Sequence, residues 1–341
     1  MDYKVTIGIP VYNVERYIRQ TLDAALAQTF TDIEFLICDD CGTDNSIAIV
    51  RQYQQEHPRG QHLRIVRQPE NRGIGEGRNR MMAEAQGRYF YSLDADDTIS
   101  PDAIELLYNA ALRHQAEIVY GSHERVTVND NSSYTEQLVY PAKVFTRPDE
   151  YAQYVYDTGI QVMNWNYLID LNVVRRNHLQ VTPVRHGYGE DYTYTVDLPT
   201  YITRAVLLPN ITYRYQIDAS AVTAKREKVM DRQQMDLALA AIDQKKRRTE
   251  LSHKPYYARR CAKLLMYDFY FAHEMILHQG TMKHPYTNTE IRNTLWHPMS
   301  LWQILRSPQA RGHNLGAWVL GHLSPSLAVM LIKRLGQQMK K

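Results

Sequence analysis

Residues 92–97 of the chain read Ser-Leu-Asp-Ala-Asp-Asp. It follows an apolar, aromatic run at residues 89–91, which predicts a buried strand, and precedes Ser-Pro at 100–101, which predicts the N-cap and first position of a helix. The acidic residues are therefore expected at the carboxyl end of a strand. Because residues two apart in an extended chain project to the same side, Asp94 and Asp96 are expected to face the same space beyond that strand.

Two carboxylates at this position suit a hard divalent cation. Mg²⁺ is typically held by one or two carboxylates together with substrate phosphates and water, and Mn²⁺ shares its preference for oxygen ligands. An Asp-x-Asp in a turn is more often a solvated cap. The metal interpretation of Asp94 and Asp96 therefore depends on whether the rest of the chain supplies a nucleotide pocket around them.

Length and composition set the class of protein. The chain has 341 residues and 44% hydrophobic content, which is enough for one large domain with a smaller one, or for two medium domains. A strand is expected at residues 5–9 without a preceding leader, and no apolar run approaches the roughly 18 residues of a spanning helix. The three cysteines, an odd number, favour a reducing compartment. We expect a cytoplasmic protein.

Cys38 and Cys41 have the C-x-x-C spacing of redox and zinc sites. Only Cys261 remains elsewhere in the chain, so cysteine alone cannot supply the four ligands of a structural zinc site. We interpret the two residues as small side chains that flank the acidic pair Asp39 and Asp40.

Short apolar runs alternate with amphipathic stretches over residues 4–93. The expected strands are 5–9, 33–38, 63–66 and 89–93, and the expected helices are 14–28, 44–55 and 75–86. This alternation predicts an α/β fold with a mainly parallel, twisted sheet covered by helices. Ligands of such sheets bind outside the carboxyl ends of the strands.

Polar side chains follow each of the four expected strands and so meet at one edge of the sheet. In chain order they are Pro10, Tyr12 and Asn13, then Asp39 and Asp40, then Asn71, Gly73, Arg78 and Asn79, and finally Asp94 and Asp96. Solvation alone rarely explains why polar side chains of four independent turns meet at one edge. We therefore predict a nucleotide pocket here. A carboxylate can accept from a nucleobase N–H, Tyr12 can stack on the base, and Arg78 can neutralise phosphate or steady the acidic cluster.

The glycines at residues 73–77 suggest one competing interpretation, the dinucleotide-binding fingerprint. Its sixth position is Arg78 here rather than Gly or Ala, and no acidic partner is clearly placed. We therefore exclude a dinucleotide-dependent dehydrogenase.

Six motifs follow one another in the first 125 residues, namely IPVYNVE at 9–15, QTF at 28–30, DDCGTDNS at 39–46, ENRG at 70–73, GRN at 77–79 and LDADD at 93–97. As an ordered set they resemble the family 2 glycosyltransferases of the bacterial surface-glycan type, which have the GT-A nucleotide-sugar-binding fold. The departures are mild. The family more often has a hydrophobic residue at Cys38 and Gly-Ser at 41–42, and neither change removes a needed functional group.

The resemblance implies roles for individual residues of the pocket. Pro10 and Tyr12 line the nucleotide, Asp40 together with Asp39 contacts the base, and Arg78 lies beside the nucleotide. Asp94 and Asp96 form the DxD motif of a site for Mn²⁺ or Mg²⁺, with Asp96 as the more direct ligand. The remaining expected members of the nucleotide-sugar-binding set are Asn13, Glu15, Asn71, Gly73 and Asn79.

A second stretch that carries chemistry reads Gly-Tyr-Gly-Glu-Asp-Tyr-Thr-Tyr at residues 187–194. Glycines open onto Glu190 and Asp191 and an amphipathic run follows, so both carboxylates are expected in the first turn of a helix. Acids at that position often only complement the helix dipole. The family resemblance implies instead that Asp191 is the general base and that Glu190 orients the acceptor or Asp191.

An aromatic cluster surrounds Trp165 at residues 164–168. Trp165 either forms a wall on the acceptor side, since sugar faces pack on aromatic rings, or packs in the core as an ordinary apolar residue. Both interpretations stay open.

Charge divides the chain into two parts. Residues 225–341 carry 20 basic and 8 acidic side chains, whereas residues 1–224 carry 20 basic and 29 acidic ones. We predict a GT-A catalytic domain at 1–224, with nucleotide-sugar binding in 1–125 and the acceptor side in 126–224. A basic helical region is expected at 225–341, with the basic runs at 245–248 and 259–260 on solvated faces.

Two short apolar stretches near the end, at 315–323 and 327–335, are flanked by basic residues. They are too broken to span a bilayer, but they fit an interfacial anchor on the anionic inner face of the cytoplasmic membrane. The alternative is a helical pair that packs on the catalytic domain or on a second subunit. Nothing favours a nucleic-acid partner, because the basic residues are not interleaved with aromatic ones on a recognisable motif.

Together these features predict an inverting, metal-dependent glycosyltransferase of the hexosyl or N-acetylhexosaminyl class. The expected donor is a nucleotide-diphosphate sugar, in the first place a UDP-sugar. The expected acceptor is a hydroxyl of a glycan or lipid-linked acceptor in surface polysaccharide biosynthesis. Two other classes stay open. One is a nucleotidyltransferase, which would release pyrophosphate, and the other is a non-catalytic nucleotide- or glycan-binding module.

Overall fold

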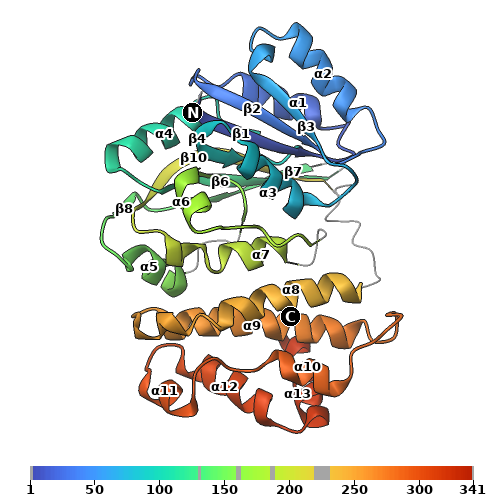
Figure 1. The fold of residues 1–341 in the computed structure, drawn as a ribbon, viewed down its shortest axis with the longest axis vertical. Helices are drawn as coiled ribbons and strands as arrows, with labels where there is room; N and C mark the ends of the chain where they lie inside the picture. The colour runs from blue at the N-terminus through green and yellow to red at the C-terminus, as the bar shows by residue number, and fades with distance from the viewer. Residues whose placement is uncertain (1–2, 130–131, 159–162, 185–188, 219–230, 340–341) are drawn as a thin grey trace. The chain divides into compact units, whose positions relative to one another are not determined.

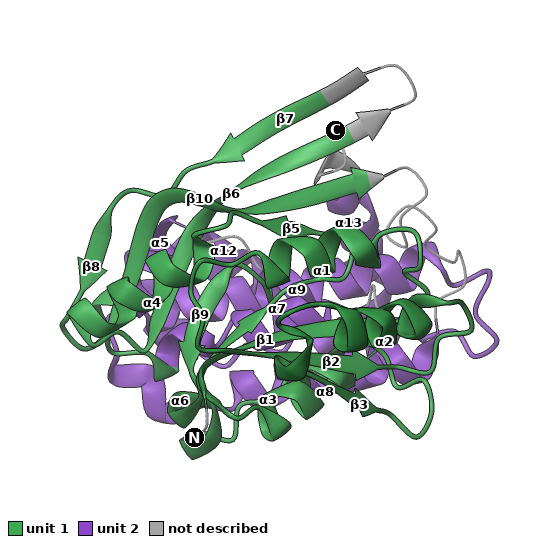
Figure 2. Ribbon diagram, turned by 90° about the horizontal axis from the view of Figure 1, so that it is seen from above, with its two compact units in different colours: residues 1–151, 163–187, 201–225 green, residues 152–162, 188–200, 226–341 purple. Residues whose placement is uncertain are grey.

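The computed structural model describes residues 3–129, 132–158, 163–184, 189–218 and 231–339. The chain divides into two compact units, shown in Figure 2. Unit 1 comprises residues 1–151, 163–187 and 201–225, and unit 2 comprises residues 152–162, 188–200 and 226–341. Unit 2 thus takes in short segments from the middle of the chain as well as the basic region. The domain boundary at residue 224 stays a prediction.

Unit 1 is built on a ten-stranded sheet with the order β3-β2-β1-β4-β9-β6-β10-β5, to which β7 adds beside β6 and β8 beside β10. The strands are β1 (Tyr3–Val11), β2 (Ile33–Asp39), β3 (Leu63–Arg67), β4 (Gly87–Ser92), β5 (Thr98–Ile99), β6 (Ile118–Asn129), β7 (Ser132–Leu138), β8 (Lys143–Phe145), β9 (Tyr167–Asp170) and β10 (Ala205–Asp218).

The strands β1 to β4 are parallel to one another. β1 pairs with β2 on one side and with β4 on the other, and β3 extends the sheet beyond β2. All seven residues of β2 are buried, as expected for a strand covered on both faces. The four strands therefore end at the same edge of the sheet, which confirms the predicted edge. Beyond β4 the sheet is mixed, because β9 runs antiparallel to both β4 and β6.

Helices connect the strands and cover the sheet (Figure 1). They are α1 (Ile18–Leu26), α2 (Ser46–Glu56), α3 (Ile74–Glu84), α4 (Ala103–His114) and α6 (Leu171–Arg176), and α5 (Glu150–Thr158) crosses from unit 1 into unit 2. The predicted start of a helix at residues 100–101 is wrong by two residues. β5 pairs with β10 and keeps the chain extended as far as Ile99, so α4 takes Asp102 as its N-cap.

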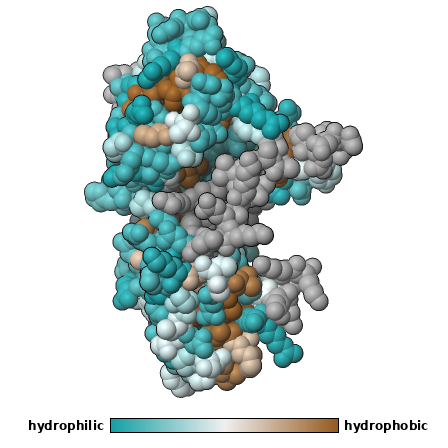
Figure 3. Space-filling model, turned by 90° about the vertical axis from the view of Figure 1, so that its right-hand side faces the viewer, coloured by the Kyte–Doolittle hydropathy of each residue, from teal (hydrophilic) through white to brown (hydrophobic). Residues whose placement is uncertain are grey.

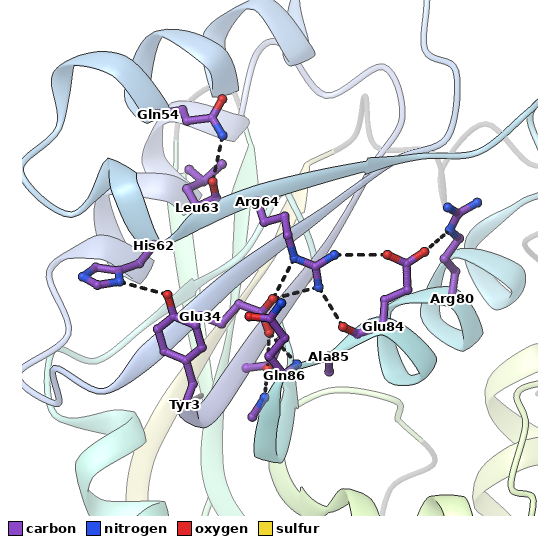
Figure 4. A network of polar contacts seen from close by, with 12 residues as sticks. Tyr3, Glu34, Gln54, His62, Leu63, Arg64, Arg80, Glu84, Ala85 and Gln86 are labelled. Carbon is purple, nitrogen blue, oxygen red and sulfur yellow. Dashed lines mark hydrogen bonds and ion pairs between the residues drawn. The ribbon is translucent and has the colours of Figure 1, made fainter. Parts of the chain in front are cut away.

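A polar network ties the sheet together at the amino ends of its strands, opposite the predicted site (Figure 4). The carboxylate of Glu34, which is buried, accepts from Thr6 Oγ1 at 2.6 Å, Arg64 Nε at 3.0 Å and Gln86 N at 2.8 Å. Arg64 also donates to Glu84 Oε2 at 3.1 Å. The network joins β1, β2 and β3 to the end of α3, and so fixes the helix whose other end reaches the site.

Unit 2 is helical in its described part. Its helices are α7 (Glu190–Thr195), α8 (Arg232–Lys246), α9 (Tyr257–Leu277), α10 (Asn288–Thr294), α11 (Leu301–Arg306), α12 (Arg311–His322) and α13 (Pro325–Met339). The long α9 is the centre of the unit, since α8, α10, α12 and α13 all pack against it. The predicted helical character of the basic region is confirmed for residues 231–339. None of the helices in the described ranges is long and apolar enough to cross a membrane.

The prediction that the basic runs lie on solvated faces is wrong for two of their members. Lys246 is 1% exposed and donates to Asp268 Oδ2 at 2.7 Å, and Arg260 is fully buried against Asp197. A buried cation is tolerated when a carboxylate and further hydrogen bonds compensate it. These partners are 22 and 63 residues away along the chain, so no local pattern reveals them.

Candidate functional site

The turns after β1 and β2 are joined by hydrogen bonds. Asn13 has a φ of 52°, and its Oδ1 accepts from Thr43 N at 2.7 Å. A Cβ on Gly42 would lie 3.0 Å from Asn13 N, so the close approach of these turns favours glycine there. Glu15 accepts from Asn45 N at 3.0 Å. Asn13 and Glu15, both predicted site residues, thus shape the edge of the pocket.

Tyr12 and Pro10 flank the end of β1. The Tyr12 side chain is 43% exposed, which leaves its ring available for stacking, whereas Pro10 is half-buried within the strand. An exposed aromatic ring at the carboxyl edge of a parallel sheet is the arrangement that the predicted nucleobase contact needs.

Asp39 and Asp40 are buried at the end of β2. Asp40 accepts from Arg72 N at 2.8 Å and from Gly73 N at 2.9 Å, and Asp39 accepts from Cys41 N at 3.0 Å. Burial raises the pKa of Asp40 above its ordinary value, although the two backbone N–H groups act in the opposite direction. The acids therefore hold the turns in place, and their contact with a base stays a prediction.

The loop that leads into α3 carries Asn71, which is exposed, and Gly73, which has a φ of 84°. Two residues later, a Cβ on Gly75 would meet a backbone carbonyl oxygen of residue 182 at 2.5 Å. Asn79 donates to Val181 O and accepts from Val181 N, both at 2.7 Å. The start of α3 is therefore pinned to the segment that follows α6.

Arg78 and Asp94 form the central ion pair of the site. Arg78 NH2 lies 2.7 Å from Asp94 Oδ1, and the arginine side chain is only 4% exposed. Asp94 and Asp96 are half-buried, while the intervening Ala95 and the following Asp97 are buried. The expected extended course of the run is wrong, because residues 95 and 96 form a turn and Asp97 N donates to Asp94 O at 3.1 Å. Of the two predicted uses of Arg78, the structure favours the one that steadies the acidic cluster.

Asp97 anchors the acidic turn through its buried carboxylate. This role was not predicted from the sequence. Asp97 is fully buried and accepts from Tyr213 OH at 2.6 Å and from Gln216 N at 2.8 Å. Burial and the neighbouring acids raise its pKa well above the ordinary value. On the other side, Thr21 Oγ1 donates to the carbonyl oxygens of Ala95 and Asp97, each at 2.9 Å. β10 and α1 thus fix the turn that presents Asp94 and Asp96.

Trp165 is 8% exposed and packs in the core of unit 1. Its ring stacks on Tyr213 with a centroid distance of 4.2 Å, and more loosely on Tyr215 at 5.5 Å. Trp165 therefore supports the tyrosine that holds Asp97. Its place on the acceptor side stays a prediction.

Glu190 and Asp191 belong to unit 2 and lie in the first turn of α7, as predicted. The N-cap Gly189 has a φ of 77°, and a Cβ there would lie 3.0 Å from the ring of Phe271 on α9. One turn further, Tyr192 stacks on Tyr267 at 4.4 Å. The preceding Gly187 and Tyr188 lie outside the described residues.

Asp197, two residues after α7, joins this helix to α9 and to the segment that follows α8. It accepts from Arg260 Nε at 2.8 Å and from Arg248 NH1 at 2.6 Å. Arg260 NH2 also donates to Lys245 O at 2.7 Å. Burial raises the pKa of Asp197, but the two arginines outweigh it and hold that pKa below its ordinary value. The helix that bears Asp191 is thus bound along its length to α9.

The donor set of the acidic turn bears on whether it can hold a cation. Among the described residues, no group of three or more His, Cys, Asp or Glu side chains is arranged to hold a metal ion. Mg²⁺ in nucleotide-using enzymes needs only one or two carboxylates, because phosphates and water complete its shell. Asp94 and Asp96 fit a cation of that kind, shared with a diphosphate.

Comparison with known proteins assigns the family. Residues 6–167 match the family described as Glycosyl transferase family 2. This part of the chain belongs to glycosyl transferase family 2. The predicted resemblance is confirmed. The polar edge formed by β1 to β4 lies within the matched residues.

Two relatives illustrate the match. Glycosyltransferase GlyA of Streptococcus pneumoniae serotype 4 is 31% identical over 157 residues, which make up 46% of this chain and 21% of GlyA. UDP-Glc:alpha-D-GlcNAc-diphosphoundecaprenol beta-1,3-glucosyltransferase WfgD of Escherichia coli is 28% identical over 143 residues, or 42% of this chain and 53% of WfgD. The match thus spans 21% and 53% of these relatives' own lengths.

A solved structure extends the likeness to nearly the whole chain. Residues 1–349 of S. aureus TarS, in complex with UDP-GlcNAc, match with a TM-score of 0.59 at 14% identity, covering 98% of this chain and 92% of that one. At this identity the likeness concerns the fold. It confirms the predicted GT-A fold followed by a helical region.

The structure brings one part of the predicted site together and leaves the other in a separate unit. The residues gathered at the carboxyl edge of unit 1 are Pro10, Tyr12, Asn13, Glu15, Asp39, Asp40, Asn71, Gly73, Arg78, Asn79, Asp94 and Asp96. The residues of unit 2 are Glu190 and Asp191. The functional role of each residue stays a prediction.

Proposed function

We propose that the protein is an inverting, metal-dependent glycosyltransferase. It moves a sugar from a nucleotide-diphosphate donor, a UDP-sugar, to a hydroxyl of a glycan or lipid-linked acceptor in surface polysaccharide biosynthesis. The observation that carries the proposal is the half-buried pair Asp94 and Asp96 at the carboxyl edge of the family 2 domain, steadied by Arg78 at 2.7 Å.

The choice of a UDP-sugar is supported by two comparisons. WfgD is named for UDP-Glc, and the TarS structure holds UDP-GlcNAc. In this chain the exposed ring of Tyr12 offers a stacking surface for the base. Asp40 uses one lone pair on each oxygen for a backbone N–H, so each oxygen keeps a second lone pair for a nucleobase N–H.

A divalent cation, Mn²⁺ or Mg²⁺, stabilises negative charge on the departing diphosphate when it is bound. Asp96 is its proposed ligand, with Asp94 beside it. The pairing of Asp94 with Arg78 fixes the orientation of that carboxylate, and Asp97 fixes the turn on which both acids stand. These residues therefore set the position of the diphosphate end of the donor.

The proposed reaction is a single displacement. Asp191 takes the proton of the acceptor hydroxyl while the hydroxyl oxygen forms a bond to the anomeric carbon. The bond from that carbon to the diphosphate oxygen breaks on the opposite face, which inverts the configuration, and the carbon passes through an oxocarbenium-like state. Glu190 orients the acceptor or Asp191.

The proposed acceptor class also suggests a location. The name of WfgD includes a diphosphoundecaprenol-linked sugar, a lipid-linked acceptor. An enzyme with such an acceptor works at a membrane surface, here the inner face of the cytoplasmic membrane.

The test is a nucleotide-release assay with UDP-, GDP- and dTDP-sugars in the presence of Mn²⁺, Mg²⁺ or EDTA. We expect UDP release from one UDP-sugar that EDTA abolishes. Asp96→Ala and Asp191→Asn are expected to lose it, whereas Glu136→Gln, which changes an exposed carboxylate on β7, is expected to retain it.

Other outcomes separate the alternatives. In a parallel assay, release of pyrophosphate from UTP and a sugar 1-phosphate, with formation of the UDP-sugar, would identify a nucleotidyltransferase instead. Binding of a donor without turnover, across a panel of acceptors, would identify a binding module. Metal-independent release that survives in Asp96→Ala would remove the proposed role of the acidic turn.

A further inference from the structure

The three helices α11, α12 and α13 expose an unusual number of large apolar side chains. Of the fourteen exposed large hydrophobic side chains among the described residues, six lie between residues 302 and 335. They are Trp302 (71%), Leu305 (44%), Val319 (41%), Leu327 (39%), Met330 (58%) and Leu335 (43%), and we call them the C-terminal apolar surface. Figure 3 shows a strip of apolar side chains on the face of unit 2 that it displays. Exposed apolar side chains favour an interaction site where they lie side by side, as Leu327 and Met330 do one turn apart on α13.

The exposed residues of α13 are additional to those that hold the helix in place. Ala328 and Ile332 are fully buried one turn apart and form its inner side, which packs against α9 and α10. Leu327 and Met330 are three residues apart and lie on another side of the same helix. α13 therefore has apolar residues on its outer side as well, and a helix of that kind is normally covered.

The same segment is strongly cationic. Residues 291–341 contain seven Lys and Arg residues and no Asp or Glu. Lys333 and Arg334 are exposed and follow Met330 by three and four positions, so they share its side of α13. On α11 the guanidinium carbon of Arg306 lies 5.8 Å from the ring centroid of the exposed Trp302. Apolar and positive groups are thus interleaved on the surface.

We propose that the C-terminal apolar surface docks on an anionic lipid bilayer. Helices with Trp, Leu and Met beside Lys and Arg bury their apolar side chains at the headgroup boundary, while the cations meet anionic lipids. Exposed Trp is favoured at that boundary. This inference does not depend on the reaction proposed above.

A second copy of the chain is a poorer occupant of this surface. A twofold interface places the same patch on both sides, so it would bring one cationic segment without acids against another. Like charges at such a contact oppose association, whereas anionic headgroups complement them.

The test is co-sedimentation of the full chain with vesicles of phosphatidylcholine alone and of phosphatidylcholine mixed with phosphatidylglycerol. Binding is expected only to the anionic vesicles and is expected to weaken with added salt. The double variant Met330→Ser, Arg334→Glu should bind at least about tenfold more weakly. Both positions are exposed, so the variant should unfold at the wild-type temperature.

The matched control is Leu112→Ser, Arg113→Glu, which changes an exposed leucine and its neighbouring exposed arginine on α4 of unit 1. This variant should bind the vesicles as the wild type does. Nucleotide release measured without vesicles should be the same in all three proteins, which separates failure of docking from failure of the proposed reaction.

Three results would overturn the proposal. They are no binding to anionic vesicles, equal binding to both kinds of vesicle, and wild-type binding by the Met330→Ser, Arg334→Glu variant. A dimer seen by sedimentation velocity that this variant abolishes would assign the surface to a second copy instead.

Discussion

Arg78 NH2 donates to Asp94 Oδ1 at 2.7 Å, so a residue of α3 holds the first acid of the turn after β4. The two acids of the turn are therefore not equivalent. Asp94 is held by an arginine that is almost completely buried, whereas Asp96 is the proposed ligand of the metal ion.

Arg78→Lys tests this division of roles. Lysine keeps the positive charge but lacks the planar fork of the guanidinium, so Asp94 loses its fixed orientation. We expect nucleotide release to fall about 10- to 100-fold and the metal concentration for half-maximal rate to rise. Arg80→Lys is the control, because Arg80 lies on the same helix but pairs with Glu84 at the surface. Equal rates for the two variants would show that the buried pair has no role in turnover.

Tyr12→Ala tests the proposed stacking on the base. The ring is 43% exposed, so its removal should change the free energy of unfolding by no more than about 0.5 kcal/mol. Loss of stacking costs about 1–3 kcal/mol, so the KM for the donor should rise roughly 5- to 150-fold while Tyr12→Phe stays near wild type. Tyr134→Ala removes a ring that is 67% exposed on β7 and should leave the KM unchanged. An unchanged KM in Tyr12→Ala would exclude the stacking role.

Arg260→Lys tests the attachment of α7 to α9. Lysine keeps the charge beside Asp197 but cannot make both the contact with Asp197 and the bond to Lys245 O. A small displacement of Asp191 is expected to lower kcat up to about 100-fold, with the KM for the donor unchanged because the donor residues lie in unit 1.

The control for that variant is Lys246→Arg, which alters another buried ion pair of the unit, with Asp268 on α9. It should lower stability without this selective loss of kcat. Equal kcat values in the two variants, at equal folded fractions, would mean that the Asp197 contact contributes to folding alone.

His297 gives the protein a predictable response to acid. Its Nδ1 accepts from Met299 N at 2.9 Å, so Nε2 carries the proton and donates to Asn314 Oδ1 at 3.1 Å. Burial lowers its pKa from 6.5 to about 4. Between these values the unfolded chain binds a proton that the folded chain does not, so stability should fall as the pH drops from about 6.5 to about 4.

Urea unfolding across that pH window provides the measurement. His297→Gln should remove part of the acid-induced loss of stability, whereas His313→Gln, at an exposed position on α12, should retain it. If the free energy of unfolding fell equally with pH in the wild type and in His297→Gln, His297 would not be the source of the acid response.

Local patterns predicted the four parallel strands β1 to β4 and the edge at which the polar residues meet. Each of the strands β1 to β4 is a short apolar run followed by a turn, and parallel pairing brings the ends of such strands together. β5 was missed because a strand of two residues is too short to show an alternation of apolar and polar side chains. Its existence depends on pairing with β10, which lies more than a hundred positions later.

Within the site, the sequence predicted which residues lie at the carboxyl edge of the sheet. It did not predict which groups they bind in the folded chain. The acidic run pointed to Asp94 and Asp96, yet the third acid proved to be a buried anchor for Tyr213, 116 positions away. Asp40 was expected to face a base, and the structure shows that it binds the backbone N–H groups of residues 72 and 73. Such pairings are set by the tertiary fold, and no spacing rule encodes them.

The attachment of α7 to α9 bears on how this enzyme could be re-engineered. A graft that carried residues 189–197 without α9 would lose the contacts of Gly189, Tyr192 and Asp197 with Phe271, Tyr267 and Arg260. In a chimera, both stretches must therefore come from the same parent protein, although about sixty residues separate them in the chain.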